Sequence, residues 1–187
     1  MQRIKKGEYG YVAGQKKWVS VKTAVLFLLS LAIYLSGYIT TGSNKNLLTI
    51  VAVLGCLPAG KSAVNMIMFL RARGCDGALH EKIAAHAGDL PALYDCVLTT
   101  YENTFEVPHM VFKGNSLIGI AVASGFKTAE CEKHLRNMCT QNGIRDVNIR
   151  IFTDVSRYLQ RLDQLQELNA SDDQTEAVLS LIRAISI

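Results

Sequence analysis

The feature that most constrains this chain is a run without charged residues from Thr23 to Asn44, TAVLFLLSLAIYLSGYITTGSN. As a helix this run would span about 33 Å, which is enough to cross a bilayer core of about 30 Å. A cleaved signal peptide is the main alternative, but its apolar region is expected to be only about 7–15 residues long. Because a basic segment, residues 1–22, also precedes the run, the sequence predicts an uncleaved membrane anchor.

A second apolar run extends from Leu47 to Leu70, and Lys61 is its only charged residue. Pro58 and Gly60 lie inside it, so it forms either one helix or a helix broken near these two residues. The sequence therefore predicts a helical hairpin of two transmembrane segments, with the lipid bilayer as its partner. The predicted bounds are residues 23–73 for the hairpin, with helices at about 23–42 and 47–70.

The formal net charge of +4 is distributed unevenly along the chain. Residues 1–74 hold ten Lys and Arg and one acid (10 − 1 = +9), whereas residues 75–187 hold ten basic and fifteen acidic residues (10 − 15 = −5). Since cytoplasmic flanks of membrane helices carry an excess of Lys and Arg, this bias predicts that the N-terminus and the C-terminal domain are both cytoplasmic. The membrane-flanking cations are Lys16, Lys17, Lys22, Lys61, Arg71 and Arg73.

Gly55, Gly60, Lys61 and Ser62 fit the pattern G-x-x-x-x-G-K-[ST], in which backbone N–H groups cradle phosphates and the lysine reaches the terminal ones. Over these eight residues the chain resembles the Walker A motif of phosphate-loop NTPases, which implies nucleotide binding. No evident series of βαβ units follows, and the motif lies in an apolar stretch that phosphate would not enter. We keep nucleotide binding as an alternative and expect no cofactor.

Residues 75–187 predict a cytosolic α+β domain with the element order α-β-β-β-α-β-α-α. The predicted helices are 78–87, 127–142, 154–168 and one that opens with a capping-box pattern at 171–174 and ends at residue 185. The predicted strands are 94–105, 107–112, 117–122 and 146–152, and Pro91 is expected to open a short helical turn ahead of them.

This order of elements is similar to the core of restriction-endonuclease-like nucleases, which include membrane-anchored members. The resemblance implies an acidic residue on one strand and Glu-x-Lys on the next strand, which together hold a divalent metal. The strands here offer Asp95, Glu102 and Glu106, with Lys113 seven residues beyond Glu106, and no Glu-x-Lys. An active or degenerate enzyme of this topology is a second alternative. The acidic balance of the domain predicts no nucleic-acid partner.

The remaining reactive side chains favour structural roles. His80 and His86 are six residues apart, which turns the second ring to a different helix face and excludes the spacing of a zinc-protease motif. Glu130 and His134 are expected to pair on the surface of their helix rather than to share a metal. The five cysteines include no C-x-x-C pair and are expected to be free thiols.

We therefore predict no catalytic residue and no metal site. The leading hypothesis is a non-catalytic integral membrane protein that presents a small acidic interaction domain to the cytoplasm. Its expected partner is a second copy of the chain or another membrane protein.

Overall fold

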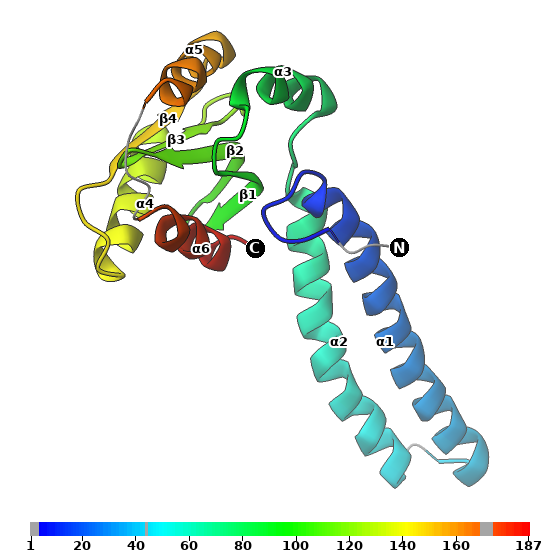
Figure 1. The fold of residues 1–187 in the computed structure, drawn as a ribbon. Coiled ribbons are helices and arrows are strands. Elements are labelled where there is room, and N and C mark those ends of the chain that lie inside the picture. The colour runs from blue at the N-terminus through cyan, green and yellow to red at the C-terminus, as the bar shows by residue number, and fades with distance from the viewer. Residues whose placement is uncertain (1–3, 44, 169–173) are drawn as a thin grey trace. The chain divides into compact units, whose positions relative to one another are not determined.

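The computed structural model describes residues 4–43, 45–168 and 174–187. They form two compact units, which we call the apolar hairpin, residues 12–72, and the α+β domain. The α+β domain contains the residues from Arg73 onward and also the described residues before Val12 (Figure 1). We name residues 4–10 the N-terminal connector and residues 73–76 the C-terminal connector, because they lead into and out of the hairpin.

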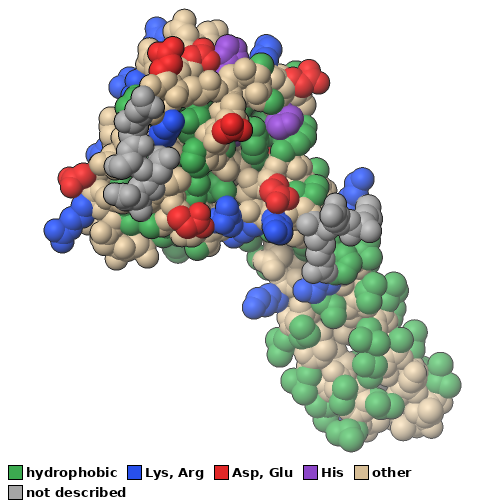
Figure 2. All heavy atoms as spheres, in the orientation of Figure 1, with side chains coloured by type: hydrophobic (Ala, Val, Ile, Leu, Met, Phe, Trp, Pro, Cys, Tyr) green, Lys and Arg blue, Asp and Glu red, His purple; other side chains and the backbone are tan. Residues whose placement is uncertain are grey.

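The apolar hairpin consists of α1 (Tyr11–Thr41) and α2 (Leu47–Arg71), which are both long and apolar enough to cross a membrane. Helix α1 begins well before the predicted transmembrane run, because the basic residues ahead of Thr23 are good helix formers. Helix α2 is continuous through Pro58 and Gly60, so the second apolar run forms one helix and is not broken near these two residues. Hydrophobic side chains are spread along the hairpin face shown in Figure 2.

Small and hydroxylated residues line the contact between α1 and α2. Thr23, Ser30 and Gly37 are buried at a spacing of seven residues, as expected where two helices wrap around each other. The hydroxyl oxygens of Thr23 and Ser62 lie 2.8 Å apart. A Cβ atom added to Gly55 would lie 2.9 Å from Oγ of Ser30, so the two backbones approach closely there.

The α+β domain is built on a four-stranded sheet with the spatial order β1-β2-β3-β4. Its strands are β1 (Ala92–Thr99), β2 (Thr104–Lys113), β3 (Ser116–Ile120) and β4 (Asn148–Phe152). Its helices are α3 (Gly77–Ala87), α4 (Thr128–Gln141), α5 (Val155–Gln166) and α6 (Thr175–Ile185). Strand β2 is antiparallel to both β1 and β3, and β4 runs parallel to β3 after the crossover through α4. This is the predicted order of elements.

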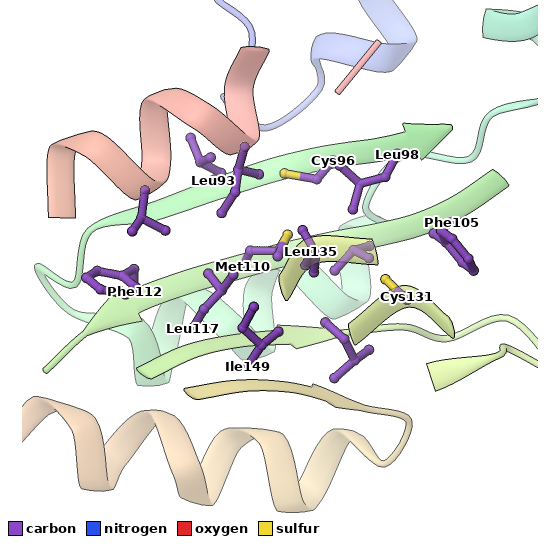
Figure 3. Packing of buried hydrophobic residues seen from close by; sticks show 14 of the residues in the cluster. Leu93, Cys96, Leu98, Phe105, Met110, Phe112, Leu117, Cys131, Leu135 and Ile149 are labelled. Carbon is purple, nitrogen blue, oxygen red and sulfur yellow. The ribbon is translucent and has the colours of Figure 1, made fainter. Parts of the chain in front are cut away.

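Two hydrophobic clusters hold helices on opposite faces of the sheet (Figure 1). Helices α4 and α6 cover one face through residues such as Leu135 and Ile182, and Figure 3 shows this cluster from close by. Helices α3 and α5 cover the other face, where Ile83 and Leu162 are fully buried. The sheet is therefore the middle layer of three.

Strands β1 and β2 exchange faces halfway along their length. The facing pairs are Leu93 with Met110, Tyr94 with His109, and Cys96 with Val107. The Leu93–Met110 pair and the Cys96–Val107 pair both lie on the face covered by α4 and α6. Strict alternation along the strands would instead place the Cys96–Val107 pair on the face covered by α3 and α5. Asp95 has a φ of 55° and lies opposite Pro108, which has no N–H to donate, so the ladder is interrupted there.

Two sequence predictions near this point are wrong. The single strand predicted over residues 94–105 is divided by a turn, in which the N–H of Thr100 donates to the carbonyl of Asn103 at 2.8 Å. Pro91 does not open a helical turn. It directly precedes β1, and its carbonyl accepts the N–H of Phe112 from the neighbouring strand β2.

Aspartate caps begin α3 and α5. The carboxylate of Asp76 accepts a backbone N–H at 3.2 Å, and that of Asp154 accepts one at 2.8 Å. Of the capping box predicted at 171–174, only Gln174 lies within the described residues, and its side chain makes no capping hydrogen bond.

Candidate functional site

The N-terminal connector is bound to the edge strand of the α+β domain. The carbonyl of Gly7 accepts the N–H of Tyr94 at 2.8 Å, at the outer edge of β1. Gly7 has a φ of 93°, and a Cβ atom there would lie 2.6 Å from Leu93, so the position requires glycine. Nearby, Nζ of Lys6 donates to the carbonyl oxygen of Ser186, which ties the connector to the end of α6 as well.

A row of five rings continues from this connector into the core, and we call it the ring row. Tyr9 lies face to face on His80, with ring centroids 3.7 Å apart and planes 6° apart. His80 meets Tyr94 edge to face at 5.1 Å, and Tyr94 lies 4.4 Å from His109. Nδ1 of His109 is 2.7 Å from the hydroxyl of Tyr158, so the row links the connector to α5.

Burial controls protonation in the ring row. Burial, with a smaller contribution from the neighbouring His80, lowers the pKa of His109 to about 3. Burial also raises the pKa values of Tyr94 and Tyr158. His109 is therefore neutral at physiological pH, far from the pKa that suits a general base. Among the described residues, Nε2 of His109 and Nδ1 of His80 are buried without a hydrogen-bond partner.

The C-terminal connector is held by two carboxylates. The N–H of Cys75 donates to Asp95 at 2.6 Å, and the N–H of Arg73 donates to Glu106 at 3.0 Å. Gly74 lies between them, where a Cβ atom would come within 3.0 Å of the Asp95 carboxylate. Burial and the charge of Asp95 raise the pKa of the Cys75 thiol to about 12, so this cysteine is a weak nucleophile.

The two connectors are therefore attached to adjacent residues of β1, Tyr94 and Asp95. We call this arrangement the connector clamp. It comprises both connectors, these two residues, Glu106 and His80. The sequence indicated a break near Gly74 but gave no local sign of the clamp. Gly7 and Tyr9 lie in a segment whose most evident sequence property is its basic charge.

The residues of the Walker-A-like pattern lie within helix α2. From Gly55 to Ser62 the backbone is helical, so its N–H groups are committed to the helix and do not form the loop that the motif requires. The hydroxyl of Ser62 contacts Thr23 of α1. Lys61, the neighbouring residue, is exposed.

The residues considered for a nuclease site are distributed over the domain. Asp95 and Glu106 belong to the connector clamp, whereas Glu102 lies in the turn between β1 and β2. Lys113 is seven residues beyond Glu106 on the same strand, roughly 23 Å away at about 3.3 Å per residue. Strand β3 carries no acidic residue and no lysine. The structure thus does not assemble these side chains into one metal site.

Other candidate groups remain separate. No cluster of three or more His, Cys, Asp or Glu that could hold a metal occurs among the described residues. His86 contacts Asp163 at 2.8 Å, whereas His80 belongs to the ring row. Glu130 forms an ion pair with Lys127 at 3.1 Å. All five cysteines are free.

Comparison of the chain with protein-family models, with curated proteins and with solved structures found no match.

Proposed function

We propose that this chain is an integral membrane protein whose hairpin anchors a non-catalytic interaction domain at the cytoplasmic face of the bilayer. The observation that carries the proposal is the connector clamp. Because the segment before α1 and the segment after α2 bind the same strand, both ends of the hairpin must emerge on the same side of a membrane.

The surface of the hairpin supports membrane insertion. Large apolar side chains are exposed along both helices, for example Leu28 at 64%, Ile39 at 79% and Leu57 at 70% of their surface. Exposed apolar area costs about 25 cal/mol per Å² in water, and a bilayer removes this cost. Most of the buried residues of the two helices are small, as is usual in membrane helix pairs, and Val12 and Val19 are the exceptions.

The charges of the hairpin support a cytoplasmic location for its ends. The contact of Thr23 with Ser62 places Lys22 and Lys61 at the same level of the antiparallel pair. From this level to the end of α1 at Thr41 the helix carries no charge over about 28 Å, close to the bilayer core thickness of about 30 Å. The level of Lys22 and Lys61 therefore corresponds to the cytoplasmic boundary.

The α+β domain supports an interaction role rather than chemistry. Its described residues assemble no metal cluster, and its most buried imidazole is neutral. A domain held at the membrane meets other membrane-bound proteins at a high effective concentration, so modest affinity is sufficient for assembly. We therefore propose a second copy of the chain or another membrane protein as its partner.

Reporter fusions test the topology. A reporter inserted after Ser43 is expected to be active on the far side of the membrane, and one fused after Ile187 is expected to be active in the cytoplasm. A far-side C-terminus would overturn the proposed orientation. Extraction of the chain from membranes by carbonate alone would contradict integral insertion.

Crosslinking of the native membrane, followed by affinity capture and native electrophoresis, tests the interaction role. We expect a complex larger than one chain that survives mild detergent. A strictly monomeric chain without a captured partner would contradict the proposal. Metal-dependent nuclease activity of the purified chain, abolished by Glu106→Gln, would instead favour the enzyme alternative.

A further inference from the structure

We propose that the α+β domain binds the phosphate group of a small soluble molecule at the corner of the sheet formed by β3, β4 and α5. A pocket of about 260 Å³ opens there. We call it the corner pocket, and its lining residues are Ser116, Ile118, Asn148, Arg150, Phe152 and Arg161.

The strand register shows that the lining residues of β3 and β4 share one face of the sheet, and Arg161 comes from α5. Ser116 faces Asn148, and Ile118 faces Arg150, on the side that α5 covers. One step further along the same rows, Ile120 faces Phe152, and there the hydrophobic core under α5 begins. This face of the sheet thus changes from apolar to polar side chains along its strands. Apolar residues at the polar positions would have extended the hydrophobic core.

The pocket concentrates positive charge in an otherwise acidic domain. Two guanidinium groups and no carboxylate line it, although residues 75–187 carry a net charge of −5. Among the described residues, neither Arg150 nor Arg161 forms an ion pair. The charge of the pocket is therefore not neutralised by the part of the chain that the structure describes.

Both arginines are positioned by neighbouring side chains. The guanidinium of Arg150 lies over the ring of Phe152, 5.8 Å from its centroid. Nη1 of Arg161 donates to the side-chain oxygen of Gln164 at 2.8 Å. Each guanidinium has five N–H donors, so most of the donors remain available to a ligand.

Phosphate is the group that matches these donors. Guanidinium forks bind phosphate oxygens in pairs, and the amide of Asn148 and the hydroxyl of Ser116 add neutral donors beside them. A volume of about 260 Å³ is at the lower end of ligand pockets, which favours a phosphate on a small molecule. The acidic domain disfavours a nucleic-acid strand.

The position of the pocket favours a soluble ligand over a lipid headgroup. The C-terminal connector binds Glu106 near the start of β2, whereas the pocket adjoins the other end of that strand, where Lys113 faces Ser116. These two ends are roughly 23 Å apart at about 3.3 Å per residue. The corner pocket is thus remote from the connectors that lead to the apolar hairpin.

Titration calorimetry of the full chain in nanodiscs of zwitterionic lipid tests the proposal, with inorganic phosphate and glycerol 3-phosphate as probes at constant ionic strength. We expect saturable binding that Arg150→Gln or Arg161→Gln weakens at least about tenfold, with unchanged circular dichroism. Arg150→Lys is expected to give intermediate affinity because it keeps the charge but loses the fork. The matched control is Arg136→Gln, an exposed position on α4, which should bind like the unmodified chain.

Absence of saturable binding by the unmodified chain, or an equal loss in Arg136→Gln, would overturn the proposal. A second arm repeats the titration in nanodiscs that contain anionic phosphatidylglycerol. We expect the same affinity for both probes. If anionic lipid abolishes their binding, a headgroup occupies the pocket and the assignment to a soluble molecule is wrong.

Discussion

Tyr9 and His80 lie face to face with their ring centroids 3.7 Å apart, although the entire apolar hairpin separates them in the sequence. The contact closes the chain into a loop that begins and ends on the α+β domain.

The first prediction concerns the stacking of Tyr9. Tyr9→Ala should lower the free energy of unfolding of the α+β domain by about 1 kcal/mol, because a stacked ring pair contributes about that much. The same substitution should also accelerate hydrogen exchange at the backbone N–H of Tyr94, which donates to the carbonyl of Gly7. Tyr9→Phe should preserve both values. Tyr101→Ala is the matched control, since Tyr101 is fully exposed, and equal effects of the two alanine variants would contradict the stacking role.

The second prediction concerns the hydrogen bond from Cys75 to Asp95. Asp95→Ala should lower the free energy of unfolding by about 2–3 kcal/mol, because it removes a buried charged acceptor and strains a left-handed backbone. Asp95→Asn should cost less, since asparagine tolerates a positive φ and keeps an oxygen acceptor. Both values follow from urea denaturation.

Asp146 provides the control for this pair of variants. It also has a positive φ, of 60°, but its side chain is exposed. Asp146→Ala should therefore show only the backbone cost of about 1 kcal/mol. If Asp95→Ala costs no more than Asp146→Ala, the carboxylate does not hold the connector.

The third prediction is a dependence of stability on pH. Burial lowers the pKa of His109 to about 3 from an ordinary value of 6.5, so between these values the unfolded chain binds a proton that the folded chain does not. The contribution of His109 to stability is therefore complete above pH 6.5 and falls as the pH falls toward 3. From pH 7 to pH 4 the loss is roughly 3 kcal/mol.

His109→Gln should flatten this acid slope, as measured by chemical denaturation at several pH values. His86→Gln is the control, because His86 is on the surface, where it contacts Asp163. An unchanged slope in His109→Gln would show that other groups cause the acid sensitivity.

The fourth prediction compares two glycines of helix α2. Gly55→Leu should separate α1 from α2, because even a Cβ atom there would lie 2.9 Å from Oγ of Ser30. Gly60→Leu should be tolerated, because no atom lies within 4 Å of the added Cβ position. The readout is the disulfide yield of Thr23→Cys with Ser62→Cys in micelles, which should fall several-fold only with Gly55→Leu. A similar fall with Gly60→Leu would contradict the close contact.

The apolar hairpin was predictable because its evidence is local. Length, lack of charge and flanking cations all lie within one stretch of sequence, and α1 and α2 follow from them. The start of α1 at Tyr11 was missed because membrane partition selects the apolar part of a helix, whereas helix propensity extends it into the basic segment.

The strands were predicted in the correct order but with errors where the backbone departs from regular alternation. The exchange of faces at Asp95 and Pro108 makes the buried pattern of β1 and β2 aperiodic, so the periodicity of the sequence could not place the turn after Thr99. The connector clamp was not predictable at all. It depends on contacts such as Gly7 with Tyr94, which join residues far apart in the sequence.

The clamp also imposes an order on biosynthesis. The carbonyl of Gly7 leaves the ribosome early, but its partner, the N–H of Tyr94, is made only after both hairpin helices. Under the proposed topology, a chain in which only one of the two helices crossed the bilayer would hold Gly7 and β1 on opposite sides, and the outer edge of β1 would lose its contact with Gly7. Completion of the clamp would thus require that both helices cross the bilayer or that neither does, and a copy with one inserted helix would leave this strand edge open to cellular proteases.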